Sequence, residues 1–158
     1  MGASVSRTTR LTRHIAGPRA AVYRALLDRD AVRLWMVPDG MTSEVHAFDP
    51  RVGGGFRISL TYDAPDAAGK SVANTDTHHG VFTELVADEK VVQVIAFETD
   101  DPTMAGDMTV TYSLSDSADG GTELVGVHEN LPVGVSLADN ELGWRIALDK
   151  LAALVESA

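Results

Sequence analysis

The chain has 158 residues and is 44% hydrophobic, which suits one domain with a single core over residues 1–158. Its net charge of −10, with three lysines and ten scattered arginines, argues against nucleic acid or an anionic membrane surface as a partner. It has no cysteine, which excludes disulfides and thiolate catalysis, and it has neither a long apolar run nor a signal sequence, so we expect a cytoplasmic protein without a membrane span.

The first quarter of the sequence predicts one strand and two short helices. The strand is expected over residues 6–15, where apolar and polar side chains alternate. Pro18 then suits the first turn of a helix over residues 18–28. A second helix is expected from Asp30 to Trp35, with Asp30 as its N-cap.

The remainder predicts a series of strands and one long helix. Strands are expected over residues 42–49, 55–62, 74–87, 90–99, 108–114 and 122–130. The helix is expected over residues 137–156, because one apolar stripe recurs at helical spacing at Trp144, Leu148, Leu151 and Val155. This order predicts an α+β fold in which an antiparallel sheet of about six strands curves around the long C-terminal helix.

The stretch DPRVGGGFRI, residues 49–58, raises the question of a phosphate-binding loop. Such a loop needs glycines that follow a strand and open a helix, so that backbone N–H groups meet the anion. Here Gly53 to Gly55 lead into a strand, and no Gly-Lys-Ser/Thr follows. We therefore expect a tight turn or a bulge, where glycine tolerates a positive φ.

The histidines give no metal site by their spacing. His78 and His79 are adjacent, so on a strand they point to opposite faces and cannot both bind one ion. His14, His46 and His128 lie on three separate predicted strands. We expect no metal and no cofactor.

Two residues are candidates for acid–base chemistry, and each has an alternative interpretation. If Leu124 faces inward, so does His128, which could be a general base, a hydrogen-bond partner that orients a ligand, or a satisfied core histidine. Glu84 shares the face of Phe82 and Val86 on a regular strand, where burial would raise its pKa, or it lies at a solvent-facing edge.

Five stretches, in order along the chain, resemble motifs of one known family. They are GPRAAVYRALLDRDAVRLW (17–35), DPRVGGGFRI (49–58), HHGVFTELVADEKVV (78–92), GGTELVGVHENLP (120–132) and GWRIALDKLAALVE (143–156). Together they resemble the START-like, or SRPBCC, superfamily, and within it the family related to the C-terminal domain of the activator of the Hsp90 ATPase. The resemblance covers nearly the whole chain.

The resemblance implies a helix-grip fold with an apolar cavity between the sheet and the long helix. The aromatic side chains, among them Trp35 and Trp144, would then pack in the core or form the wall of this cavity. By analogy, the ligand-binding residues would be Trp35, Met36, Phe56, Ile58, Phe82, Tyr112, Gly126, His128, Trp144 and Leu148.

Two departures from the family pattern bear on the cavity. Met36 stands where the family has a second tryptophan, and Gly126 stands where it has a large apolar residue two positions before the histidine. We expect these smaller or more flexible groups to enlarge or reshape the cavity near Met36, Gly126 and His128.

Three functions are compatible with this resemblance. The first is binding of a small hydrophobic molecule without chemistry of the protein's own. The second is an enzyme of the cyclase, dehydratase or isomerase type, with His128 or Glu84 as proton carrier. The third is a chaperone partner, but the chain lacks the additional N-terminal domain of the eukaryotic activators, so we do not expect an Hsp90-type partner. A homodimer would be common for such domains.

Overall fold

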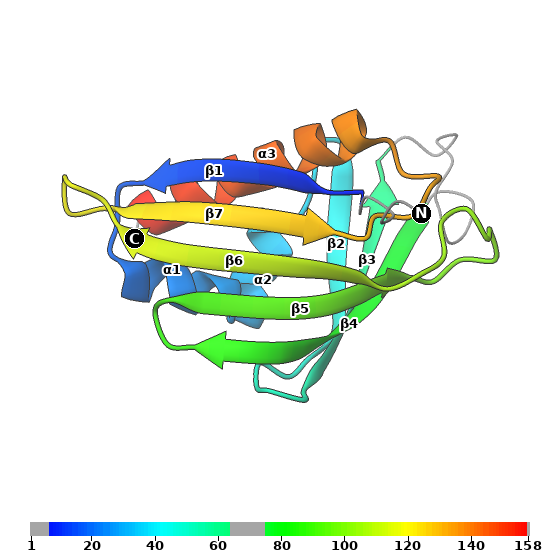
Figure 1. Ribbon diagram of the computed structural model, residues 1–158, viewed down its shortest axis with the longest axis horizontal. Coiled ribbons are helices and arrows are strands. Elements are labelled where there is room, and N and C mark those ends of the chain that lie inside the picture. The colour runs from blue at the N-terminus through cyan, green and yellow to red at the C-terminus, as the bar shows by residue number, and fades with distance from the viewer. Residues whose placement is uncertain (1–6, 64–74, 158) are drawn as a thin grey trace, which may run out of the picture.

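The computed structural model describes residues 7–63 and 75–157, which form one antiparallel sheet and three helices (Figure 1). The strands are β1 (Thr9–Ile15), β2 (Met41–Phe48), β3 (Gly55–Tyr62), β4 (Thr75–Val86), β5 (Lys90–Phe97), β6 (Met108–Asp116) and β7 (Thr122–Glu129). The helices are α1 (Arg19–Leu26), α2 (Arg29–Trp35) and α3 (Leu137–Glu156). The first residues of the strands expected at positions 6 and 74 lie outside the described residues.

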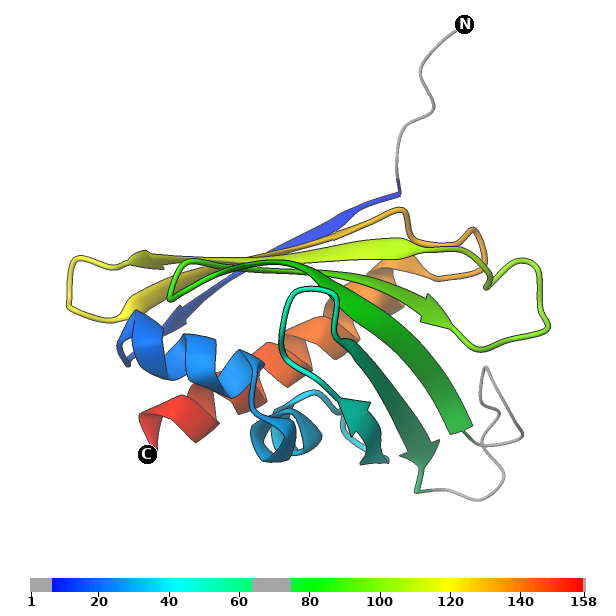
Figure 2. The ribbon, with the colours of Figure 1, turned by 90° about the horizontal axis from the view of Figure 1, so that it is seen from below.

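The sheet has seven strands in the order β1-β7-β6-β5-β4-β3-β2, and each neighbouring pair is antiparallel. In Figure 2 the three helices lie on one side of the sheet, and β2 and β3 bend down beside them. This arrangement confirms the predicted α+β helix-grip fold. The expected number of about six strands was one too low. The N-terminal strand β1 pairs with β7 and so belongs to the same sheet as the other six.

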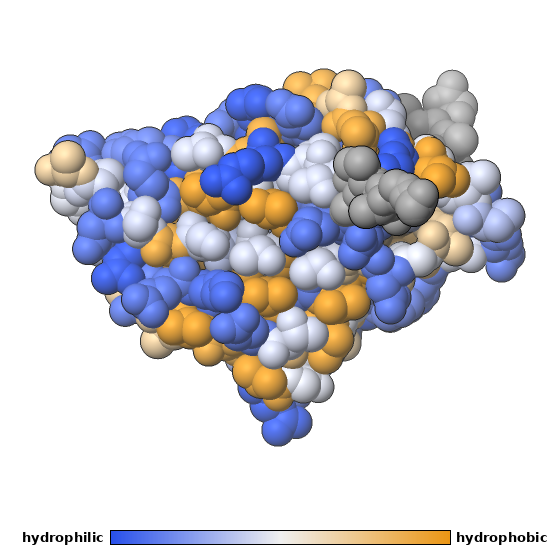
Figure 3. Space-filling view, viewed as in Figure 1, coloured by the Kyte–Doolittle hydropathy of each residue, from blue (hydrophilic) through white to orange (hydrophobic). Residues whose placement is uncertain are grey.

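None of the helices in residues 7–63 and 75–157 lies on the opposite side of the sheet. In Figure 3, which views this side, hydrophilic and hydrophobic residues are interspersed. The alternation of side chains along antiparallel strands explains this pattern, since one face packs on the core and the other meets solvent. None of the described helices is long and apolar enough to cross a membrane.

The two short helices are separate because Asp28 caps the second one. Its carboxylate accepts hydrogen bonds from the backbone N–H groups of Asp30 (2.8 Å) and Ala31 (3.1 Å), two of the donors that a helix start leaves free. The predicted cap, Asp30, is therefore wrong by two residues and lies inside the first turn. Pro18 similarly lies just before α1, in an extended conformation.

The long helix α3 lies across the inner face of the sheet along its predicted stripe. Leu148, Leu151 and Val155 are buried against β1 and the two short helices, and Trp144, one to two turns earlier, is partly buried. Ser136 caps the helix by accepting from the N–H of Asp139 at 3.2 Å. The C-terminal half of α3 thus fills one end of the curved sheet.

The glycine stretch forms the turn between β2 and β3. The carbonyl of Gly55 accepts from the N–H of Asp49 at 2.9 Å, and Gly53 has φ +84°. The turn also pairs with β4, since Gly53 N–H donates to the Phe82 carbonyl and Phe82 N–H donates to the Gly54 carbonyl. The predicted tight turn is confirmed, and its backbone hydrogen bonds join the β2–β3 connection to strand β4.

Gly54 permits this turn because a side chain there would meet the backbone. An added Cβ would lie 2.1 Å from the Asp49 carbonyl oxygen, whereas at Gly55 its nearest neighbour would be 3.4 Å away. We expect Gly54→Ala to lower the free energy of unfolding by at least about 2 kcal/mol, because the backbone must move. We expect Gly55→Ala to change it by about 0.5 kcal/mol or less. Urea denaturation of the two variants measures this, and equal stabilities would contradict the assignment.

Candidate functional site

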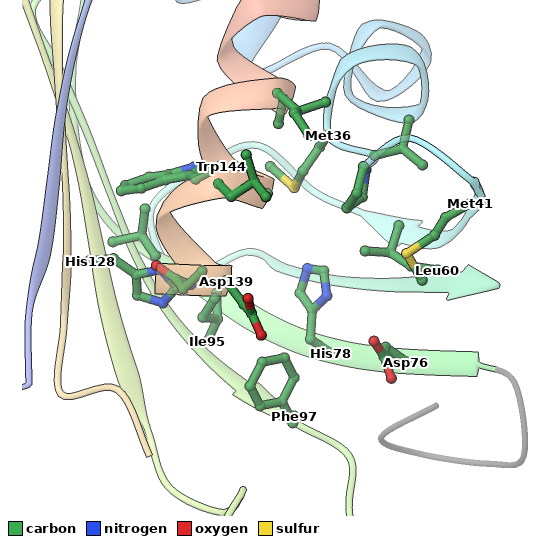
Figure 4. A pocket seen from close by; sticks show the side chains of 18 of the residues that line it. Met36, Met41, Leu60, Asp76, His78, Ile95, Phe97, His128, Asp139 and Trp144 are labelled. Carbon is green, nitrogen blue, oxygen red and sulfur yellow. The ribbon is translucent and has the colours of Figure 1, made fainter. Parts of the chain in front are cut away.

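A pocket of about 520 Å³ lies between the first half of α3 and the inner face of the sheet. In Figure 4, His128 and Trp144 lie on one side of it and Met41 and Leu60 on the other, with His78 and Asp76 on β4 between them. The lining residues are Met36, Val37, Pro38, Asp39, Met41, Leu60, Tyr62, Asp76, His78, Gln93, Ile95, Phe97, Val110, Tyr112, His128, Asp139, Asn140, Leu142, Gly143, Trp144, Ile146 and Ala147.

The structure brings four of the expected pocket residues together at this cavity. They are Met36, Tyr112, His128 and Trp144. The rings of Tyr112 and His128 each meet the Trp144 indole edge to face, with centroids 5.8 Å and 5.4 Å away. Trp144 therefore joins the sheet to the helix at one wall of the pocket.

The other six expected residues do not line the pocket. Phe56 and Phe82 pack with Phe48 in an aromatic cluster with ring centroids 5.2–6.3 Å apart. Trp35 is 1% exposed and donates from Nε1 to the Ala25 carbonyl at 3.0 Å. The remaining three, Ile58, Leu148 and Gly126, lie within the sheet–helix core or beneath Trp144.

On β3, the pocket lies closer to the C-terminal end of the strand than the expected residues Phe56 and Ile58. On β3 the lining residues are Leu60 and Tyr62, which continue the inward face of Phe56 and Ile58. Phe56 and Ile58 belong to the buried core that also includes residues of α1 and α2, so they pack against other side chains instead of bordering the pocket. The alternation along β3 placed Leu60 on the inward face, but nothing in it indicated which end the short helices fill.

Gly126 lies beneath the Trp144 indole. A Cβ at this position would lie 2.9 Å from Cη2 of Trp144, closer than real contacts allow. The missing side chain therefore makes room for the indole against β7, so Gly126 shapes the pocket wall through Trp144 and does not itself line the pocket.

His128 is a buried polar group on this wall, with 7% of its surface exposed. Its side chain is held at one ring nitrogen, since Asn140 Nδ2 lies 3.3 Å from Nδ1. Asn140 is itself fixed by Thr9, whose hydroxyl donates to Asn140 Oδ1 at 2.7 Å. The other nitrogen, Nε2, is buried and has no hydrogen-bond partner among the described residues. The register explains the grouping, because Thr9 on β1 pairs with His128 on β7.

Sequence reasoning did not include His78 among the pocket residues, although it is a second buried histidine there. It is 9% exposed, and its ring meets Phe56 edge to face at 6.2 Å. Its neighbour His79 lies on the opposite face and bonds Glu98 at 3.2 Å, as the alternation predicts. Asp76 and Gln93 are also buried in the lining.

Burial keeps both histidines uncharged at neutral pH. Desolvation, with a smaller contribution from His78, lowers the pKa of His128 from 6.5 to about 4. Desolvation, with His79 as the next cause, lowers the pKa of His78 from 6.5 to about 4. Burial also raises the pKa of the Tyr112 phenol above its ordinary value. The inner wall therefore carries neutral hydrogen-bonding groups.

Glu84 lies outside the pocket. A β-bulge between Phe82 and Glu84 breaks the alternation, so the two side chains do not share a face. The Glu84 side chain is 50% exposed and pairs with Lys90 at 3.2 Å. The solvent-facing interpretation applies, and Glu84 cannot act on a ligand in this cavity.

A Ser–His–Asp group at the β6–β7 turn does not have the geometry of a catalytic triad. Ser117 Oγ and Asp119 both contact the same nitrogen of His14, Nε2, at 3.3 Å and 3.1 Å. A triad needs the acid on one ring nitrogen and the nucleophile on the other. Within residues 7–63 and 75–157, no group of three or more ligating side chains is placed to hold a metal ion.

One rim of the pocket is the connection between α2 and β2. Lys150 Nζ on α3 donates to the Val37 carbonyl at 2.7 Å and pairs with Asp39 at 3.2 Å. On the helix side, Leu142 is 58% exposed although it lines the pocket. The mouth thus lies between this connection and the first turns of α3.

The family model of the Activator of Hsp90 ATPase homolog 1-like protein matches residues 16–156. The chain belongs to this family. The resemblance inferred from its motifs is confirmed, and the match includes every element that lines the pocket.

Solved structures with this family's fold extend over the same length. A protein of Chromobacterium violaceum is 34% identical, with a TM-score of 0.84 over 94% of this chain and 96% of its own. A protein of Rhodobacter sphaeroides (18% identity, TM-score 0.78, 95% and 92% covered) and one of Arthrobacter aurescens (14%, 0.78, 96% and 87%) share the fold. No curated protein matches the chain.

The buried histidines predict a dependence of stability on pH. Between pH 6.5 and about 4 the unfolded chain binds protons that the folded protein does not, so stability falls as the pH is lowered and the loss is complete near pH 4. Each histidine contributes about 3 kcal/mol to this loss. Carboxylates titrate in the same range. The difference in unfolding free energy between wild type and His128→Leu, followed with pH, therefore isolates the contribution of His128. A difference that does not change between pH 7 and pH 4 would contradict the assignment.

The contact between Gly126 and Trp144 predicts a second stability effect. In Gly126→Ala the indole must move, which we expect to cost about 1–3 kcal/mol and to change the near-ultraviolet circular dichroism of Trp144. Gly143→Ala on α3 is the control, because its Cβ would meet no atom within 4 Å. We expect that variant to gain about 0.5–1 kcal/mol from helix propensity. An unchanged spectrum and stability in Gly126→Ala would show that the indole does not occupy this position.

Proposed function

We propose that the protein binds a small hydrophobic molecule in the pocket between α3 and the sheet. The observation that carries the proposal is a pocket of about 520 Å³ whose walls are mostly aliphatic and aromatic side chains. The polar groups among them come from Asp39, Asp76, His78, Gln93, His128, Asp139 and Asn140. Ligand sites have this size range and this composition, in which apolar walls supply affinity and a few polar groups supply orientation.

Features at both ends of the pocket support this proposal. At the closed end, Trp35 and the aromatic cluster of Phe48, Phe56 and Phe82 fill the interior between sheet and helices. The pocket begins beyond these side chains. The open end has exposed Leu142 at its rim, where an apolar molecule could enter. Family membership is compatible with a ligand-binding role but names no ligand.

Catalysis is less well supported by the same residues. A general base needs a free lone pair, and on His128 the nitrogen Nδ1 already faces the Asn140 amide. The second candidate, Glu84, lies outside the pocket. We therefore keep a cyclase-, dehydratase- or isomerase-type activity as the alternative. A cytoplasmic location, a homodimer and the lack of an Hsp90-type partner remain proposals that the binding function does not depend on.

Nile red, an uncharged dye whose emission rises in apolar surroundings, tests the proposal. We expect saturable binding to wild type, and at least about tenfold weaker binding to Leu60→Trp, which places an indole inside the pocket. The control is Leu34→Trp, because Leu34 on α2 is 52% exposed and does not line the pocket. Equal affinity of both variants for the dye, or no binding by wild type, would overturn the proposal.

A further inference from the structure

We propose that the ligand carries no negative charge and offers a hydrogen-bond acceptor, such as a ketone, ester or amide oxygen, to Nε2–H of His128. This inference rests on the proposed binding function and adds the chemistry of the ligand's polar group. It is carried by the hydrogen bonds around His128 and by the charges of the pocket lining.

The first observation is that His128, a residue of the pocket lining, has a buried ring nitrogen without a hydrogen-bond partner among the described residues. This nitrogen is Nε2, and the side chain is 7% exposed. A buried donor without an acceptor loses its hydration without compensation. An acceptor on a bound molecule would supply the missing partner once the side chains that cover Nε2 move enough to admit it.

The second observation is that the neighbouring bonds place the proton on Nε2. The Thr9 hydroxyl donates to Asn140 Oδ1 at 2.7 Å, which leaves the Nδ2 amide group to face His128. Nδ2 can only donate, so Nδ1 of His128 accepts and the neutral ring carries its proton on Nε2. The residues Thr9 and Asn140 therefore act as positioning residues that make His128 a donor.

The third observation concerns charge. Among the described lining residues there is no lysine or arginine, whereas Asp39, Asp76 and Asp139 are present. The two buried histidines are neutral at pH 7 because burial lowers the pKa of each to about 4. A carboxylate or phosphate drawn into this wall would lose its hydration without meeting a cation, so anionic lipids are disfavoured.

The surroundings of Nε2 also restrict the shape of the ligand. The Trp144 indole lies edge to face with His128 at 5.4 Å, and Val110 pairs with His128 across the sheet. The Tyr112 ring also lies edge to face with this indole, with centroids 5.8 Å apart. A flat or cyclic apolar body beside the acceptor would fit this wall, with its oxygen directed at His128.

Three matched probes test the inference by displacement of Nile red at pH 7.5. They are 2-acetylnaphthalene, 2-isopropylnaphthalene and 2-naphthoate, which share one ring system and differ in carrying an uncharged acceptor, no polar atom or a negative charge. We expect the ketone to bind at least about tenfold more tightly than the carboxylate.

Variants of His128 isolate the hydrogen bond from general hydrophobicity. In His128→Leu we expect the ratio of the dissociation constants, ketone to hydrocarbon, to rise about two- to tenfold. The hydrocarbon corrects for any change in pocket shape. In His128→Gln, which keeps an N–H donor, we expect a smaller rise. His78→Leu is the control in the same pocket, and we expect its ratio to match wild type.

A spectroscopic measurement tests the proton position directly. Long-range proton–nitrogen correlation spectra of the wild-type protein at pH 7.5 distinguish the two neutral tautomers and the imidazolium. We expect His128 in the Nε2–H form, with the nitrogen shift of Nε2 changing when the ketone binds. The Nδ1–H form or the imidazolium would overturn the inference.

The outcomes separate this inference from the proposed function. If Nile red and all three probes fail to bind, the binding function itself is wrong. If the probes bind but His128→Leu leaves the ratio unchanged, or if the carboxylate binds as tightly as the ketone, the binding function stands and the inference is overturned. A rise of the ratio in His78→Leu and not in His128→Leu would show that the ligand's acceptor bonds His78, and the inference would be overturned.

Discussion

The packing of α3 across the inner face of the curved sheet is the contact on which the rest of the structure depends. The helix contributes Leu148, Leu151 and Val155 to the core, and α1 and α2 close the same end of the sheet. Burial of large apolar side chains is the main favourable term in folding, so this end is dense. The two short helices do not extend to the first half of α3. The pocket occupies the space between that half of the helix and the sheet.

This division explains why similar side chains on one strand have different roles. Phe56 and Ile58 on β3 belong to the packed end, whereas Leu60 and Tyr62, on the same inward face, border the pocket. The glycine turn contributes at the packed end, because Gly53 and Gly54 bond the backbone of Phe82 on β4 and hold the aromatic cluster in place. The glycines thus stabilise the container without reaching the cavity.

The polar groups of the pocket follow from strand register. Gln93, Val110, His128 and Thr9 are consecutive partners across β5, β6, β7 and β1, so their side chains reach the same inner face. Asn140 on α3 joins this row through Thr9 and His128. One strand-to-helix hydrogen-bond chain therefore sets the orientation of a buried imidazole in the pocket wall.

Sequence periodicity predicted most of the fold, because the alternation of β3, β6 and β7 and the stripe of α3 are each set by local spacing. The resemblance to the family, rather than periodicity, supplied four residues of the pocket lining, Met36, Tyr112, His128 and Trp144. Periodicity alone did not settle the features that depend on three-dimensional contact. The bulge at Phe82 and Glu84 decides for the solvent-facing alternative at Glu84, which the spacing left open, and Gly126 accommodates Trp144. Two polar groups of the pocket, His78 on β4 and Asn140 on α3, could not be predicted without the strand register and the position of the helix.

The position of the pocket can be tested most directly by nuclear Overhauser contacts between a bound probe and labelled methyl groups. With protein labelled at isoleucine, leucine and valine methyls and saturated with 2-acetylnaphthalene, the account predicts contacts from the probe to Leu60, Ile95 and Val110. It predicts none to Ile58 or Leu148, which lie in the packed end. Contacts to Ile58 and Leu148 without contacts to Leu60 and Ile95 would contradict the account.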